Sequence, residues 1–136
     1  MGAYAKSKRA NVVSTVELAR RLRSAGLGIL GIRAIAVHPG SAMTGLQRHT
    51  DGATARALSV LAERLLMGSP QGAAWPTLYA ATSPGAESGT FIGPAGRRQD
   101  SGPPKPVRLP RGASDPAEGS RLWADSERLT GVTFTI

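Results

Sequence analysis

Cysteine is absent from the 136 residues of the chain. Its absence excludes disulfide bonds and metal sites built on thiolates, and it favours a cytoplasmic location, since disulfides mark secreted proteins. The two histidines, His38 and His49, are too few to complete a resident metal site without such ligands. We therefore expect no metal ion.

Long apolar runs are also missing. No stretch approaches the ~18 consecutive apolar residues that a membrane-spanning helix needs. Residues 1–9 are basic but have no apolar segment behind them, so they do not have the form of a signal peptide. We expect neither a membrane span nor a cleaved leader.

Acidic residues are scarce, with 9 Asp and Glu against 17 Lys and Arg, for a net charge of +8. Such an excess permits binding to nucleic acid, anionic lipid or a phosphorylated cofactor without choosing among them. A basic segment rich in Pro and Gly, residues 93–114, has no aromatic residues interleaved for base stacking. A non-catalytic basic fragment that binds nucleic acid or another anionic partner is therefore the alternative hypothesis. The basic residues of this segment are Arg97, Arg98, Lys105, Arg108 and Arg111.

The apolar pattern of the first third predicts a helix followed by a strand. Apolar residues recur at helical spacing over residues 4–25, and Gly26 supplies a stop. Residues 31–37 are short and rich in branched side chains, which predicts a buried strand that ends in the turn His38-Pro39-Gly40. A helix and strand in this order form half of a parallel βαβ unit.

The remaining chain alternates helices with irregular segments. Pro70 starts a helix with Ser69 as its cap and Pro76 inside it, and Asp115-Pro116-Ala117-Glu118 has the form of a capping box. Three aromatic residues at helical positions, Trp75, Tyr79 and Trp123, are expected to lie in the core or at an interface. The predicted elements are a loop over 41–52, helices over 53–67, 70–81 and 115–129, a strand over 90–92 and an irregular arm over 93–114. We divide the chain into residues 1–92, 93–114 and 115–136.

Tyr4 and Lys8 are candidates for chemistry, because residues four apart share a helix face. A nearby ammonium favours the phenolate form of a tyrosine, which can then exchange a proton with a substrate oxygen. Taken alone, the pair is more often two solvated residues than a catalytic unit.

The context of the pair changes that assessment. The pattern Tyr-x-x-Ser-Lys-x-Ala-Asn begins at Tyr4, and a strand then leads to His38-Pro39-Gly40-x-x-x-Thr44. Further along stand Gln71-Gly72-Ala73 and Leu122-Trp123-x-x-Ser126-Glu127. This ordered set resembles the short-chain dehydrogenases/reductases, in the branch with retinol-dehydrogenase-like and protochlorophyllide-reductase-like members.

The resemblance implies an α/β fold, the C-terminal part of a Rossmann-type doubly wound parallel sheet. It implies an oxidoreductase that uses NAD or NADP to interconvert an alcohol and a carbonyl. Tyr4 matches the general acid/base, and Lys8 matches the lysine that favours the phenolate and hydrogen-bonds the nicotinamide ribose. Pro39 and Gly40 match the turn beside the nicotinamide, and Thr44 matches a contact to the carboxamide or phosphate end of the cofactor. For His38 we expect a local hydrogen-bonding role.

The chain also departs from the family pattern. The glycine-rich phosphate loop, the residue that reads the adenosine ribose, the catalytic serine and the first five strands of the sheet are missing. Gly26-x-Gly28-x-x-Gly31 has the dinucleotide-loop spacing, but it follows a helix and precedes a strand, the reverse of the required order. We read it as a helix stop and linker.

These departures set our expectations for the chain as it stands. We expect a truncated C-terminal half that is inactive alone. The implied partner is a small-molecule alcohol or carbonyl substrate, and the family precedent is a homo-oligomer. The leucines of residues 41–67 either line a pocket for an apolar substrate or only pack, and the sequence does not choose between the two. The choice between NAD and NADP lies outside these residues.

Overall fold

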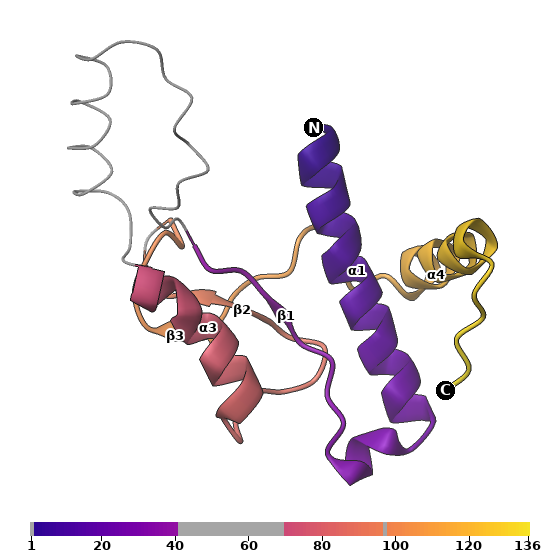
Figure 1. Cartoon of the computed structure of the whole chain (residues 1–136), viewed down its shortest axis with the longest axis horizontal. Coiled ribbons are helices and arrows are strands. Elements are labelled where there is room, and N and C mark those ends of the chain that lie inside the picture. Colours follow the sequence, from indigo (N-terminus) through magenta and orange to yellow (C-terminus); the bar gives the residue numbers. More distant parts are fainter. Residues whose placement is uncertain (1, 41–69, 97) are drawn as a thin grey trace. The chain divides into compact units, whose positions relative to one another are not determined.

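The computed structural model describes residues 2–40, 70–96 and 98–136 (Figure 1). Its elements in chain order are α1 (Ala3–Ser24), the 3-10 helix η1 (Leu27–Leu30), β1 (Ala36–Val37), α3 (Pro70–Thr82), β2 (Phe91–Pro94), β3 (Pro104–Pro106) and α4 (Pro116–Thr130). Four sequence predictions lie outside the described residues: the loop over 41–52, the helix over 53–67, the Ser69 cap and the position of Thr44.

The described chain packs as two compact units. The first contains residues 2–36, 84–91 and 108–136, and so holds α1, η1 and α4. The second contains residues 37–40, 70–83 and 92–107, and so holds α3 and β3. The boundary falls within β1 and β2, and the two units are described separately below.

Helix α1 confirms the helix predicted over residues 4–25. Its buried apolar side chains are Val12, Val13, Ala19 and Leu22, which recur at helical spacing. The helix ends where Gly26 adopts a left-handed conformation with φ of 74° and donates its amide to the Arg23 carbonyl at 3.1 Å. This glycine stop is the one predicted from the sequence.

Two apolar clusters form the core of the first unit. The first cluster consists of Val12, Val13, Ala36 and Ala113, with Val16, Phe91, Leu109 and Leu122 packed against it. The second consists of Ala19, Leu22 and Ala34, with Leu18, Leu27 and Ile136 against it. Both clusters use one face of α1, so the helix organises this unit.

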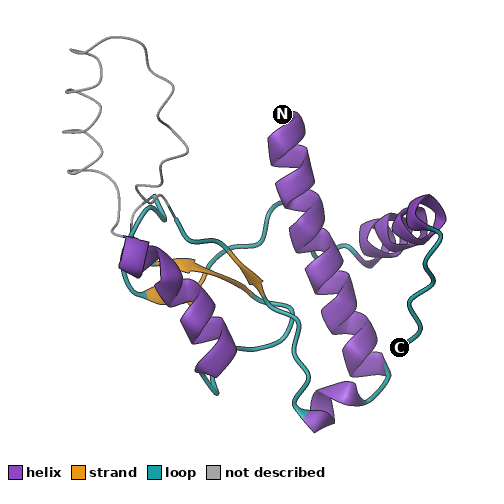
Figure 2. Ribbon diagram, in the orientation of Figure 1, coloured by secondary structure: helices purple, strands orange, loops and turns teal. Residues whose placement is uncertain are grey.

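The strands form a sheet in the order β1-β2-β3 (Figure 2). Strands β1 and β2 are parallel, with the Ala36 amide bonded to the Thr90 carbonyl at 3.0 Å and the His38 amide to the Ile92 carbonyl at 2.9 Å. Strand β3 pairs antiparallel with β2, opposing Ile92 to Pro106. The mixed α/β class expected from the sequence is confirmed.

Two strand predictions need correction. The strand predicted over 31–37 is confined to Ala36–Val37, because Gly31 turns with φ of 79° and the Ala34 amide bonds to the Ser88 hydroxyl instead of a neighbouring strand. The arm predicted over 93–114 is not irregular throughout, since it contains β3. Prolines hid this strand from the pattern, and they are tolerated because β3 lies at the edge of the sheet.

Helix α4 confirms the predicted start and stop, with one difference. Asp115 Oδ1 accepts the Ala117 amide at 2.9 Å, and Gly131 ends the helix with φ of 69°. Glu118, however, does not close a capping box: it pairs with Arg9 of α1, and the Asp115 amide bonds to the Gly112 carbonyl instead. A tertiary ion pair has replaced a local cap.

Helix α3 confirms the helix predicted over 70–81, with Pro70 as its first residue and Pro76 inside and fully buried. Trp75 is 50% exposed, so it does not lie in the core, and an interface remains the expected place for it. None of the helices in the described ranges is long and apolar enough to cross a bilayer.

Candidate functional site

Tyr4 and Lys8 lie in the first turns of α1, on one face, as their spacing predicted. The Lys8 Nζ sits 5.4 Å from the centroid of the Tyr4 ring, a cation–π geometry, and the Ser7 hydroxyl donates to the Tyr4 carbonyl at 2.8 Å. Tyr4 is 75% exposed. A phenol and an ammonium are therefore held together where another molecule can reach both.

The Pro39–Gly40 turn follows β1 and belongs to the second unit. Gly40 has φ of 76°, and a Cβ there would lie 2.8 Å from Pro94 Cγ and 2.9 Å from the Asp100 carbonyl carbon. Only glycine fits this position. The turn stands at the carboxyl end of a parallel strand, where open α/β sheets bind their ligands.

His38 connects this turn to a distant loop. Its Nδ1 accepts the Gly40 amide at 3.3 Å, and its Nε2 lies 3.0 Å from Gln99 Oε1. The local hydrogen-bonding role expected for His38 is confirmed. The sequence did not identify Gln99 as a functional candidate, because it lies inside the segment predicted to be an irregular arm. Its positive φ of 58° is a backbone feature that no sequence pattern predicts.

The predicted site residues fall into separate groups. Tyr4 and Lys8 are in the first unit, while Pro39 and Gly40 are in the second. Thr44 is outside the described residues. Across residues 2–40, 70–96 and 98–136, no three His, Asp or Glu side chains gather where they could hold a metal ion.

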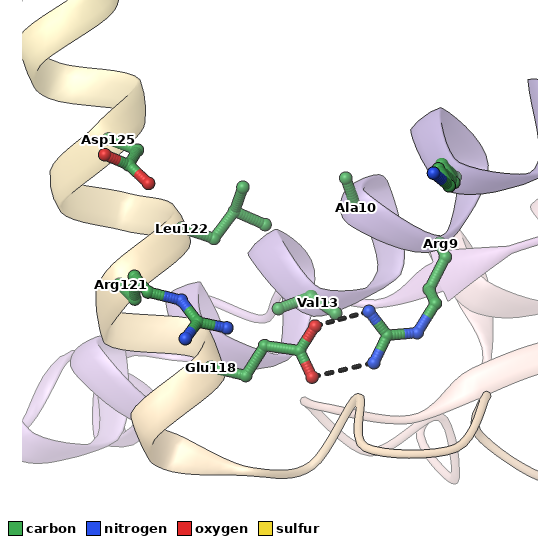
Figure 3. Close-up of a pocket in the computed structure, with 8 residues that line it drawn as sticks. Arg9, Ala10, Val13, Glu118, Arg121, Leu122 and Asp125 are labelled. Carbon is green, nitrogen blue, oxygen red and sulfur yellow. Dashed lines mark hydrogen bonds and ion pairs between the residues drawn. The ribbon is translucent and has the colours of Figure 1, made fainter. Parts of the chain in front are cut away.

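A pocket of about 470 Å³ opens between α1 and α4 within the first unit (Figure 3). Its wall is apolar at Ala10, Val13 and Leu122, and Figure 3 shows Arg9 of α1 facing Glu118 of α4 across it. The remaining lining residues are Lys6, Arg121 and Asp125. Neither Tyr4 nor Lys8 lines this pocket, which sequence reasoning did not anticipate.

The Arg9–Glu118 pair is bidentate and joins the two helices. Arg9 Nη2 donates to Glu118 Oε2 at 2.7 Å and to the Arg111 carbonyl at 2.8 Å, and Arg9 Nη1 donates to Glu118 Oε1. The hydrogen bond from Arg9 lowers the pKa of Glu118, and the same bond raises the pKa of Arg9. Both groups stay charged at neutral pH, so the pair fixes α1 to α4.

No protein-family model matches the sequence. Retinol dehydrogenase 13 from Homo sapiens is 36% identical over 135 residues, covering 96% of this chain and 37% of its own length. The short-chain dehydrogenase/reductase pkfC from Emericella nidulans is 41% identical over 81 residues, 60% of this chain and 23% of its own length. The crystal structure of an uncharacterised protein from Mycobacterium paratuberculosis matches with a TM-score of 0.62 and 36% identity, over 98% of this chain and 40% of that one. The chain belongs to the short-chain dehydrogenase/reductase family.

The chain spans about 37% of the length of its retinol dehydrogenase relative. For a short-chain dehydrogenase/reductase, the small sheet with a parallel pair is part of a Rossmann fold, and the solved structure agrees. The family resemblance drawn from the sequence motifs is therefore confirmed.

Proposed function

We propose that the full-length protein containing this chain is an NAD(P)-dependent oxidoreductase that interconverts an alcohol and a carbonyl. The observation that carries the proposal is the Tyr4–Lys8 pair, held together and exposed on α1 of a short-chain dehydrogenase/reductase. The oxidoreductase relatives support the reaction class. This chain, which spans about 37% of the length of its retinol dehydrogenase relative, is proposed to be inactive alone.

The proposed chemistry assigns a proton to Tyr4. In oxidation, the Tyr4 phenolate oxygen accepts the substrate hydroxyl proton while the carbinol C–H bond breaks and the C=O bond forms; in reduction, the Tyr4 hydroxyl returns that proton to the oxygen. When bound, nicotinamide supplies the hydride donor or acceptor. In the proposed reaction Lys8 presents its ammonium beside Tyr4, with its Nζ 5.4 Å from the centroid of the ring.

The residues present fit one end of the cofactor only. Lys8 would hold the nicotinamide ribose, Pro39 and Gly40 would flank the ring, and Thr44 would contact the carboxamide or phosphate end. The described glycines do not fit the pyrophosphate, because Gly26 and Gly31 adopt left-handed conformations that frame η1, after a helix instead of after a strand. These glycines instead form the helix stop and linker that the sequence predicted.

Replacing the phenol hydroxyl tests the proposal. In the full-length protein, Tyr4→Phe should lower the turnover of alcohols and aldehydes with NAD(H) or NADP(H) by about 10²–10⁴-fold, the usual contribution of a positioned acid/base. Tyr79→Phe is the matched control, since Tyr79 is the other tyrosine of the chain and lies on α3. Full activity in Tyr4→Phe would overturn the assignment.

A further inference from the structure

Gln99 and His38 form a connection that the proposed reaction does not use directly. His38 comes directly after β1, and Gln99 lies in the loop that joins β2 to β3. Their side chains meet at 3.0 Å although the residues are far apart in sequence. All the residues involved belong to the second unit.

The hydrogen bonds around His38 fix its tautomer. A backbone amide can only donate, so the Gly40 N–H at 3.3 Å requires Nδ1 to be an acceptor. A neutral imidazole with a bare Nδ1 carries its proton on Nε2, which then donates to Gln99 Oε1 at 3.0 Å. Gln99 therefore selects the form of His38 that holds Gly40.

The surroundings leave this ring little freedom. A Cβ on Gly93 of β2 would overlap the His38 ring, at 2.6 Å from Cδ2 and 2.8 Å from Cε1, so the ring packs directly on the β2 backbone. Pro94 and the Asp100 carbonyl also approach Gly40 of the turn too closely for any side chain there. The conformation of the turn thus depends on contacts with the loop after β2.

That loop is itself built to present Gln99. The Ala95 amide bonds to the Pro103 carbonyl at 2.9 Å, the Gly96 amide to the Ser101 carbonyl at 2.9 Å, and the Gln99 amide to the Gly96 carbonyl at 2.9 Å. Gln99 is the one non-glycine residue with positive φ among the described residues. Unfavourable backbone of this kind persists only where its surroundings enforce it, and it concentrates at functional sites.

We propose that Gln99 and His38 are positioning residues that hold the Pro39–Gly40 turn in the conformation that receives the nicotinamide end of the cofactor. The inference rests on the proposed function, because it assumes that this turn flanks the nicotinamide. Neither residue touches the reacting atoms. Their effect is to preorganise the turn before the cofactor binds, which supports binding equally in the ground state and the transition state.

The first test reads the tautomer in the 136-residue chain itself. Nitrogen-15 NMR of labelled histidine at about pH 8, where an ordinary imidazole is neutral, should show His38 protonated on Nε2 with Nδ1 accepting a bond. In Gln99→Asn this preference should weaken, because asparagine tolerates the same positive φ but is too short to reach the ring. A proton on Nδ1 in the unaltered chain would overturn the proposal.

The second test is kinetic and uses the full-length protein. His38→Ala should raise KM for the dinucleotide about tenfold, the scale of one hydrogen bond, with kcat nearly unchanged. Gln99→Asn should also raise KM for the dinucleotide, by about threefold. His38→Asn, which keeps an acceptor near the Nδ1 position, should recover part of the loss. Gln71→Asn makes the same chemical change at an exposed site on α3 and should leave KM unchanged.

The outcomes separate the two proposals. Suppose that the unaltered protein is active and that His38→Ala and Gln99→Asn keep the same KM, or keep the same KM while a smaller fraction of the protein is active. Either result overturns the positioning role and leaves the proposed function standing. An unaltered full-length protein that neither binds nor turns over dinucleotide overturns the proposed function, and the positioning role falls with it.

Discussion

Glu17 shows what a single residue contributes to this fold. It is 2% exposed on α1, yet it carries a carboxylate. Its Oε1 accepts from Arg20 Nη2 at 2.7 Å and from Arg21 Nε at 2.8 Å, and its Oε2 accepts from Arg20 Nε at 2.8 Å. The Arg20 hydrogen bond, joined by that of Arg21, lowers the pKa of Glu17 below 4.5 despite the opposing effect of burial.

This shift predicts how stability depends on pH. Because the pKa of Glu17 is lower in the folded state, the unfolded chain takes up its proton first as pH falls from about 4.5. The contribution of Glu17 to the free energy of unfolding is therefore complete above pH 4.5 and lost as pH falls through the folded-state pKa. Urea unfolding from neutral to acid pH should show a shallower decline in Glu17→Gln than in the unaltered chain. Parallel curves would contradict the prediction.

At the scale of elements, α1 and α4 are joined by a close approach at Gly119. A Cβ on Gly119 would lie 2.9 Å from Glu17 Oε2 and 3.2 Å from Glu17 Cβ. The Arg21 guanidinium lies 4.3 Å from the centroid of the Trp123 ring, and Arg9 pairs with Glu118 nearby. One small residue and two charged contacts thus add to the apolar packing of the two helices.

Gly119→Ala should destabilise the chain although alanine favours helices. The Glu17 carboxylate cannot move aside without breaking its bond to Arg20, so the added methyl overpacks the contact, at about 1–3 kcal/mol. Alanine offsets up to about 1 kcal/mol of this through helix propensity. Gly28→Ala is the control, because nothing lies within 4 Å of a Cβ there. The measurement is the midpoint of thermal unfolding; equal midpoints for both variants would refute the packing argument.

At the scale of the whole molecule, the chain corresponds to only part of the length of its relatives. The chain aligns with 37% of the length of retinol dehydrogenase 13, and the residues proposed above to bind a dinucleotide would all hold its nicotinamide end. The phosphates and adenosine provide much of the affinity for such cofactors through backbone amides at a helix N-terminus. Cofactor binding is thus expected from the full-length protein.

A titration of the 136-residue chain checks this expectation. The fluorescence of NADH or NADPH should stay unchanged up to millimolar chain, because the described glycines Gly26 and Gly31 frame η1 and do not form a phosphate-binding turn; micromolar affinity would contradict this expectation. The same chain tests the alternative of a basic binding module, motivated by the net charge of +8. Oligonucleotide binding that weakens steeply with salt would favour that module, whereas no shift at low salt removes it.

The sequence determined the features that depend on local chemistry. The α1 helix with its Gly26 stop, the Asp115 cap, the Tyr4–Lys8 spacing and the glycine at position 40 follow from periodicity and backbone preference. The family also followed from ordered motifs. Each of these signals lies within a few residues, so the linear pattern records it.

Only the tertiary structure decided which distant groups meet. Glu118 pairs with Arg9 instead of capping its own helix as predicted. Strand β3 forms within a proline-rich segment because it pairs with the edge of β2. Gln99 contacts His38 from a loop that has no sequence signature. These outcomes depend on long-range geometry: a side chain binds the partner that the fold brings near it, and adjacent residues alone do not specify that partner.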